Sequence, residues 1–403
     1  MNAIDAKDKR GKCLALFAVL AFAFVILAAV PAAINDSDAA DAEVTEVGTP
    51  DALTNALAKD GNIKLTANIT VTTTLSVTNT NTINLNEFNI TGDKIRVFQV
   101  TGQLTLDGKG TITSTEGITD SSSVIRVGSD ATTGTPSITV MKDVTIDAPY
   151  CHALGIFGKE TDMTANIYGT IKSAAGFAVV NNGSNGLSPT TINIYDGATL
   201  QITETNDAAA VYHPGRGVIN VNGGTINGVG AGIAMKSGTL NVSGGIITAT
   251  GAAVQPPEGY SNGINASGAA IQIESNKSYY GIPDCTSTGD KEPVVLNITG
   301  GTLESKNASA IYEYLANNNS TEKTSVNSIT INNATLKSGF TTDILVSSQF
   351  AEKKAITIVG GSFSKSISDA DAAISVAANS TLKADVTLST KSNSLAIANG
   401  GTY

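Results

Sequence analysis

The chain of 403 residues has no tryptophan, two histidines and three cysteines, and only 15% of its residues are charged. Two histidines are too few to favour metal sites or proton relays built on imidazole. A formal net charge of −10 argues against a nucleic-acid partner, because such a partner requires a basic face. We therefore expect no metal ion, no cofactor and no nucleic acid, and a surface made mostly of uncharged polar side chains.

Glycine, in contrast, is abundant, with 40 residues, and much of it belongs to a repeated unit. The unit is clearest at 219–226, Ile-Asn-Val-Asn-Gly-Gly-Thr-Ile, and variants follow at 240–247, 296–303 and 356–363. Its apolar-polar-apolar triplet predicts a short strand with one buried face. Glycine then provides a corner with positive φ, after which threonine and an aliphatic residue begin a second extended segment.

The spacing of the unit is irregular, from 21 residues between Ile83 and Leu104 to 56 between Leu240 and Leu296. A unit this small cannot bury a core alone, so neighbouring copies must stack. A second strand of small residues and an aliphatic follows in most copies, which predicts at least two parallel sheets. An immunoglobulin-like sandwich is the rival all-β fold, but 21 residues are too few for one such domain.

The prediction is an all-β chain folded as a right-handed parallel β-helix of about ten coils. A short helix is expected to cap its N-terminal end. Thr49 suits the N-cap and Pro50 the first helical position, while Leu53 and Leu57 share one face. Outside the core, ladders of asparagine, threonine and serine are expected. They offer a structural interpretation of the many Asn-x-Ser/Thr triplets, which N-glycosylation would explain otherwise.

With these units the chain resembles the right-handed β-helix, pectate-lyase-like superfamily, and within it the adhesin-like cell-surface proteins. The resemblance covers residues 50–390 and includes the entry segments 58–69 and 83–90. It implies the fold more than any activity, because lyases, hydrolases and non-enzymatic adhesins share these features.

The first 42 residues are expected to be a signal peptide or an uncleaved signal anchor. Basic residues between Lys7 and Lys12 precede an apolar run over 14–30, and small residues at 40–42 or 31–33 suit cleavage. The run is at the lower limit of length for spanning a bilayer, so an uncleaved signal anchor stays an alternative to a cleaved signal peptide. Residues 43–403 are then the β-helix domain, secreted or attached to the cell surface, with membrane contact only through an uncleaved N-terminal segment.

The longest interval between copies predicts a loop-rich insertion at 252–295 around a strand at 269–273. Loops on a rigid solenoid commonly carry binding function, and this insertion contains Tyr260, Tyr279 and Tyr280. Cys151 and Cys285 lie about five coils apart. They can pair only if the loop that holds Cys285 folds back, so two free thiols are expected.

Signatures of carbohydrate-cleaving β-helix enzymes are missing, since no Asn-Thr-Asp, Asp-Asp, Gly-His-Gly or Arg-Ile-Lys run occurs. Glycoside hydrolysis needs paired carboxylates, whereas Asp143, Asp147, Asp196 and Asp207 belong to different coils. The strongest remaining pattern follows the second strand of several coils. If the coils stack in register, aromatic and charged side chains there form one strip that could bind a glycan. These residues are Tyr212, His213, Arg216, Lys236, Glu274, Tyr312, Glu313 and Tyr314.

Turn residues in solvent at a sheet edge are the alternative interpretation of this pattern. The function that fits best is an exported, non-catalytic, adhesin-like protein that binds a polysaccharide, a cell-surface glycan or a neighbouring surface. The alternative is a divergent polysaccharide lyase or glycoside hydrolase centred on His213, Arg216 and the loop tyrosines. A purely structural envelope component is a third interpretation.

Overall fold

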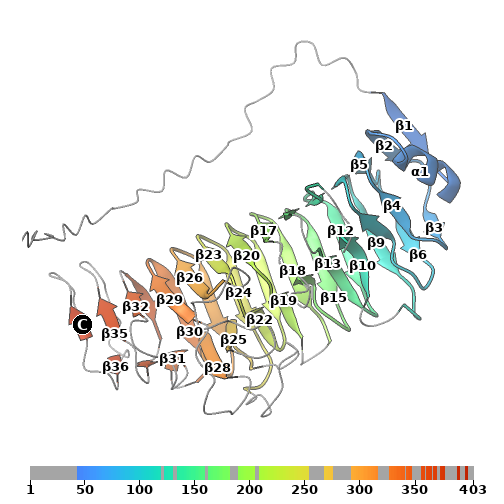
Figure 1. The fold of residues 1–403 in the computed structure, drawn as a ribbon. Helices are drawn as coiled ribbons and strands as arrows, with labels where there is room; N and C mark the ends of the chain where they lie inside the picture. Colours follow the sequence, from blue (N-terminus) through green and yellow to red (C-terminus); the bar gives the residue numbers. More distant parts are fainter. Residues whose placement is uncertain are drawn as a thin grey trace, which may run out of the picture. The chain divides into compact units, whose positions relative to one another are not determined.

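The structure is a computed structural model, and its described residues form a solenoid of three parallel sheets (Figure 1). The described residues contain one helix, and all other regular elements are strands. Residues 1–42, for which a signal peptide or anchor is predicted, lie outside them, as do the three loop tyrosines and Cys285. The described residues are 43–118, 122–129, 134–158, 162–181, 189–204, 208–253, 267–275, 292–315, 326–340, 342–346, 355–358, 360–364, 366–369, 373–376, 388–390 and 395–397.

Sheet A contains the strand of the Gly-Gly unit and has 14 strands in sequence order. They are β1 (Val44–Val47), β2 (Gly61–Leu65), β5 (Thr80–Asn84), β8 (Gln103–Asp107), β11 (Ser137–Val140), β14 (Met163–Ile167), β17 (Thr190–Ile194), β20 (Gly217–Val221), β23 (Thr239–Val242), β26 (Val294–Ile298), β29 (Val326–Ile331), β32 (Ala355–Ile358), β35 (Ala373–Val376) and β37 (Leu395–Ile397).

Sheet B is formed by the segment that follows the Gly-Gly corner and has 11 strands. They are β3 (Ile69–Val71), β6 (Ile90–Gly92), β9 (Gly110–Ser114), β12 (Val144–Ala148), β15 (Thr170–Ser173), β18 (Thr199–Ile202), β21 (Thr225–Gly228), β24 (Ile246–Ala249), β27 (Thr302–Ser305), β30 (Ala334–Ser338) and β33 (Gly361–Phe363).

Sheet C is formed by the predicted second strand of each copy, in which small residues precede an aliphatic residue, and it has 12 strands. They are β4 (Leu75–Val77), β7 (Phe98–Val100), β10 (Ser123–Val127), β13 (His152–Ile156), β16 (Val179–Asn181), β19 (Ala209–His213), β22 (Ala231–Met235), β25 (Ile271–Ser275), β28 (Ile311–Leu315), β31 (Thr342–Leu345), β34 (Ser366–Asp369) and β36 (Leu388–Thr390).

The predicted parallel β-helix is confirmed, because the chain passes through sheets A, B and C in turn and each strand pairs in parallel with the next of its sheet. Sheets A, B and C have 14, 11 and 12 strands, which agrees with the expected solenoid of about ten coils. Sheet A has the most strands because β1 precedes the helix and no described strand of sheet B follows β35 or β37.

Aliphatic side chains in matching register fill the interior of the solenoid. Ile192, Ile219, Leu240, Leu296 and Ile329 stack in one row of sheet A, and each is 0% exposed. Burying one such side chain contributes about 1.5–3 kcal/mol, so the stacked rows supply most of the driving force for folding. Neighbouring coils are required for that burial, as the small size of the repeated unit indicates.

The outer face of sheet A presents a ladder of asparagines. From the second asparagine onward, each Nδ2 donates to the Oδ1 of the asparagine in the preceding coil at 2.8–3.0 Å. The Nδ2 of the first, Asn166, donates to the Oγ1 of Thr139 at 3.4 Å. Asn241 and Asn297 head Asn-x-Ser/Thr triplets and belong to this ladder, so at these two positions the triplet has a structural explanation. The ladder comprises Asn166, Asn193, Asn220, Asn241 and Asn297.

The predicted helix is present as α1 (Pro50–Leu57), at the N-terminal end of the described solenoid (Figure 1). The Oγ1 of Thr49 accepts a hydrogen bond from the backbone N–H of Ala52 at 3.2 Å, which is an N-cap contact. Leu53 and Leu57 are 0% and 2% exposed and pack with the core. No helix among the described residues has both the length and the apolar character needed to cross a membrane.

Candidate functional site

The outer face of sheet C differs from that of the other sheets because its middle part is buried. Strands of sheet A alternate between buried and half-buried residues, whereas every residue of β19, β22 and β25 is buried. Outward-facing apolar residues form a second cluster there, separate from the core of the solenoid. It contains Phe177, Val180, Ala208, Ala209, Tyr212, Ala231 and Ala234, with Phe157 packed against it.

The strand register brings five of the predicted residues together on this face. Tyr212 and Tyr312 belong to one row of sheet C, with Ala234 and Gln272 between them. In the row two residues further along, Glu274 lies directly opposite Tyr314. An ion pair places Lys236 beside Glu274.

An ion pair lies at the centre of this group. The Nζ of Lys236 is 3.0 Å from the Oε2 of Glu274, and the two side chains are only 2% and 0% exposed. The Nε2 of Gln272 donates to the other carboxylate oxygen of Glu274 at 3.0 Å and lies 3.5 Å from the hydroxyl of Tyr314. Burial lowers the pKa of Lys236, and the neighbouring Glu274 opposes that shift.

Aromatic contacts extend this group along the sheet. The Nζ of Lys236 lies 5.8 Å from the ring centroid of Tyr212. Tyr212 stacks on Phe177 at 4.9 Å, and Phe177 stacks on His152 at 5.0 Å. At the other end Tyr314 stacks on Tyr312 at 5.8 Å. The expected strip therefore exists as a line of contacts, but most of it is buried and does not meet solvent.

His213 and Glu313 do not belong to the outward strip, and here the expectation was wrong. The register places both in the row of Met235 and Ile273, which are core residues. Successive residues of a strand face opposite sides, so a neighbour of Tyr212 or Tyr312 must point inward. The sequence prediction treated the segment as a turn, in which this alternation would not apply.

Both inward-facing groups have a hydrogen-bond partner inside the protein, although the Nε2 of His213 is buried and has none among the described residues. The Nδ1 of His213 lies 3.3 Å from the carbonyl oxygen of Ser237, and burial lowers the pKa of His213 to about 4. His213 is therefore neutral at pH 7, and Nδ1 must carry the proton, since a carbonyl only accepts. The carboxylate of Glu313 accepts a hydrogen bond from the Oγ of Ser275.

Arg216 lies at the turn that leads into β20. Its Nε is 3.5 Å from Oε1 of Glu292, and the other oxygen of that carboxylate accepts a hydrogen bond from the backbone N–H of Gly217 at 3.0 Å. Glu292 thereby fixes the turn. These contacts give Arg216 a structural partner but do not bring it to the Lys236–Glu274 pair.

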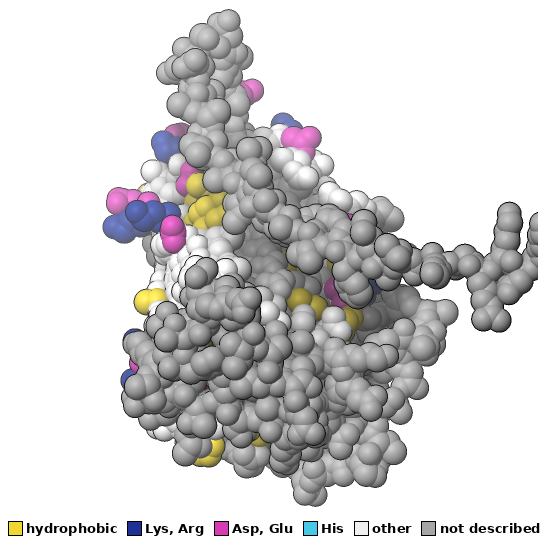
Figure 2. Space-filling model, turned by 90° about the vertical axis from the view of Figure 1, so that its left-hand side faces the viewer, with side chains coloured by type: hydrophobic (Ala, Val, Ile, Leu, Met, Phe, Trp, Pro, Cys, Tyr) yellow, Lys and Arg dark blue, Asp and Glu magenta, His cyan; other side chains and the backbone are white. Residues whose placement is uncertain are grey.

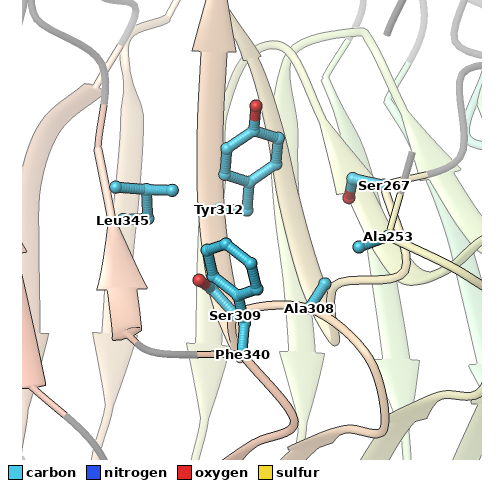
Figure 3. Close-up of a pocket in the computed structure, with 7 residues that line it drawn as sticks. All are labelled: Ala253, Ser267, Ala308, Ser309, Tyr312, Phe340 and Leu345. Atoms are coloured by element: carbon cyan, nitrogen blue, oxygen red, sulfur yellow. The ribbon is translucent and has the colours of Figure 1, made fainter. Parts of the chain in front are cut away.

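A pocket with a volume of about 230 Å³ opens beside Tyr312. Tyr312 and Leu345 occupy neighbouring positions of the outward row, and Phe340 comes from the corner before β31 (Figure 3). Phe340 is 47% exposed, which is unusual for so large an apolar side chain. The pocket is lined by Ala253, Ser267, Ala308, Ser309, Tyr312, Phe340 and Leu345, which we call the Tyr312 pocket.

Besides Tyr312, two serines bring hydroxyl groups to this lining. The Oγ of Ser309 is buried and has no hydrogen-bond partner among the described residues. The Oγ of Ser267 accepts from the backbone N–H of Ala269 at 3.3 Å. A buried polar atom without a partner is uncommon in native proteins. Sequence reasoning missed Ser309 and Phe340 because they lie outside the aligned strand ends.

None of the described residues that line the Tyr312 pocket carries a carboxylate. Elsewhere in the described part, acids lie beside bases, as in the Asp147–Lys172 pair at 2.9 Å and the Glu304–Lys337 pair at 3.3 Å. Figure 2 shows the same mixing at the upper left of its view, where acidic and basic side chains lie next to each other. Among the described residues no three His, Cys, Asp or Glu side chains are grouped to hold a metal ion.

Fold and site together define a parallel β-helix protein with a buried polar line and a small aromatic pocket on the outer face of sheet C. No protein-family model, curated protein or solved structure matches the chain at a significant level. The assignment to the class of parallel β-helix proteins therefore rests on the fold. Any proposal of a function rests on the geometry of the site.

Proposed function

We propose that the chain is an exported, non-catalytic, adhesin-like β-helix protein that binds a glycan in the Tyr312 pocket. The observation that carries the proposal is the combination of two aromatic rings with the unpaired, buried hydroxyl of Ser309. Sugar rings have apolar faces that pack on aromatic rings and hydroxyl groups that need hydrogen-bond partners. The pocket offers both.

The size of the pocket favours a small part of a glycan. Its volume of about 230 Å³ lies below the roughly 300–1,000 Å³ of pockets that enclose drug-sized ligands. One sugar unit of a longer chain fits this description better than a fully enclosed oligosaccharide. A rigid solenoid with a partly open pocket also suits a protein that attaches to a polymer or a neighbouring surface.

The location outside the cell follows from the basic and apolar N-terminal segment and is part of the proposal. Non-catalytic binding is preferred because the described lining of the pocket contains none of the paired carboxylates that glycoside hydrolysis needs. Lys236 and Glu274 form an acid–base pair on the same face of sheet C, but both are buried and hold each other. They are better placed to stabilise the face than to reach a substrate.

The test is binding of the purified protein to a glycan array, followed by calorimetry with the best neutral glycan. Replacing Tyr312 by Ala should weaken binding about tenfold, which is roughly 1.4 kcal/mol for loss of one aromatic contact. Phe340→Ala should have a similar effect. Tyr195→Ala is the matched control, because Tyr195 stacks on Tyr168 at a different corner, with centroids 4.2 Å apart.

Three results would contradict the proposal. Unchanged affinity in both pocket variants would show that the glycan binds elsewhere. An equal loss in the Tyr195 variant would indicate a general effect on the fold. Release of reducing ends or unsaturated products from the glycan would favour the lyase or hydrolase alternative instead.

A further inference from the structure

None of the described residues that line the Tyr312 pocket carries a charge. Ala253, Ala308, Phe340 and Leu345 are apolar, and the remaining lining residues are Tyr312 and the two serines. The ammonium group of an amino sugar or the carboxylate of a uronic acid would lose its hydration here without meeting an opposite charge. The lining therefore favours a sugar unit that is neutral.

The hydroxyl of Ser309 is held in a corner that the protein itself fixes. Ser309 is 2% exposed and lies between β27 and β28. Before it, the backbone N–H of Ala308 donates to the Oγ of Ser305 at 2.8 Å, and after it the N–H of Ala310 donates to the Oγ of Ser338 at 2.9 Å. The Oγ of Ser309 has no such partner among the described residues. A buried donor that is positioned in advance can bind an acceptor of a ligand at little cost in ordering.

Hydrogen-bonding groups are otherwise scarce in the described lining. The Oγ of Ser267 already accepts from the backbone N–H of Ala269 at 3.3 Å. Every hydroxyl of a sugar that enters an apolar site loses its bonds to water and needs a new partner. An unmodified hexose has a hydroxyl on most of its ring carbons. It would therefore bring more polar groups into this pocket than the two serines can pair.

We infer that the sugar unit in the Tyr312 pocket is an N-acetylated amino sugar whose acetamido carbonyl accepts a hydrogen bond from the Oγ of Ser309. The methyl group of the acetamido substituent is apolar and suits a wall that contains Ala253 and Ala308. The Oγ of Ser267 keeps one lone pair, and the amide N–H needs an acceptor. This inference names the class of sugar and rests on the proposed function.

Three trisaccharides with the same β-1,4 backbone test the inference, because they differ only at the second carbon of each sugar. Cellotriose carries a hydroxyl there, chitotriose an acetamido group, and fully deacetylated chitotriose a basic amine. Calorimetry with the purified protein should show that chitotriose binds about tenfold more tightly than either of the others. The amine should bind no better than the hydroxyl, because the lining offers it no counter-charge.

Substitution of Ser309 locates the preference. Ser309→Ala should weaken chitotriose binding about tenfold and leave cellotriose binding nearly unchanged, so that the preference disappears. The melting temperature should not fall, because this hydroxyl has no partner to lose among the described residues. Ser243→Ala is the matched control and should leave chitotriose binding unchanged. Ser243 is exposed at a corner between sheets A and B, where its Oγ lies 3.3 Å from the Oδ1 of Asn222.

The outcomes separate this inference from the proposed function. If cellotriose and chitotriose bind equally and both depend on Tyr312, the N-acetyl group is refuted and the proposed function stands. A preference for chitotriose that survives Ser309→Ala, or an equal loss in Ser243→Ala, also refutes the assignment to Ser309. A lower melting temperature of Ser309→Ala would show that the hydroxyl has a structural role instead. If no glycan depends on Tyr312, the proposed function fails and the inference fails with it.

Discussion

The buried pair Lys236–Glu274 allows a quantitative test of how the outer face of sheet C is held together. Lys236→Met keeps much of the side-chain volume and removes the charge. Glu274 is 0% exposed and would remain as a buried carboxylate with Gln272 as its hydrogen-bond donor. Removing one partner of a buried ion pair costs about 3–5 kcal/mol, compared with about 0–1 kcal/mol for an exposed pair.

Urea unfolding followed by circular dichroism measures this cost. With a slope of about 3 kcal/mol per molar, the midpoint should fall by roughly 1 to 1.7 M. The double variant Lys236→Met, Glu274→Leu removes both charges and should recover most of the loss, because replacing a whole buried pair by apolar groups is often neutral. Lys109→Met is the exposed control, since Lys109 and Glu87 are 76% and 77% exposed.

Two results would refute this reasoning. A loss below about 1 kcal/mol for Lys236→Met would show that the pair behaves as an exposed one. A double variant as unstable as the sum of both single variants would show no coupling between Lys236 and Glu274.

Two further predictions concern the core and the corners. Because burial holds the pKa of folded His213 at about 4, against an ordinary value of 6.5, the unfolded chain binds the extra proton first as pH falls. Stability should therefore decrease from pH 6.5 to pH 4, by up to about 3 kcal/mol from this residue, and His213→Gln should remove that part of the pH dependence in urea titrations. Gly245 has φ +80, and an added Cβ would lie 2.7 Å from the carbonyl oxygen of Gly223. Gly245→Ala should thus lower the melting temperature, whereas Ala at Gly61, where a Cβ meets nothing within 4 Å, should leave it nearly unchanged.

The fold could be predicted from the sequence because its signals are local and repeated. An apolar-polar-apolar triplet indicates which face of a strand is buried. Glycine recurs at the corner that follows, where Gly224, Gly245 and Gly301 have φ angles of +75°, +80° and +80°. A corner can also use another residue, as Asn333 with φ +59 does in the weaker copy of the unit at 329–336.

The site was harder to predict because it depends on contacts between distant coils. Aligning strand ends placed Tyr212, Lys236, Glu274 and Tyr312 on one face, but it could not show which of them are buried. Phe340 and Ser309 reach the pocket from corners of two successive coils. Only the three-dimensional register brings such residues together, since the pocket joins side chains from different coils.

The irregular spacing of the repeat itself points to sheet C as the variable side of the solenoid. Between a strand of sheet A and the following strand of sheet B the chain uses two to five residues, as from β20 to β21. Connections into sheet C have two to 21 residues, and those leaving it have two to 18, as from β25 to β26. Loops of variable length on a rigid scaffold are where binding residues usually lie. The Tyr312 pocket lies on this side, which is the side where the chain can change without disturbing the stacked core.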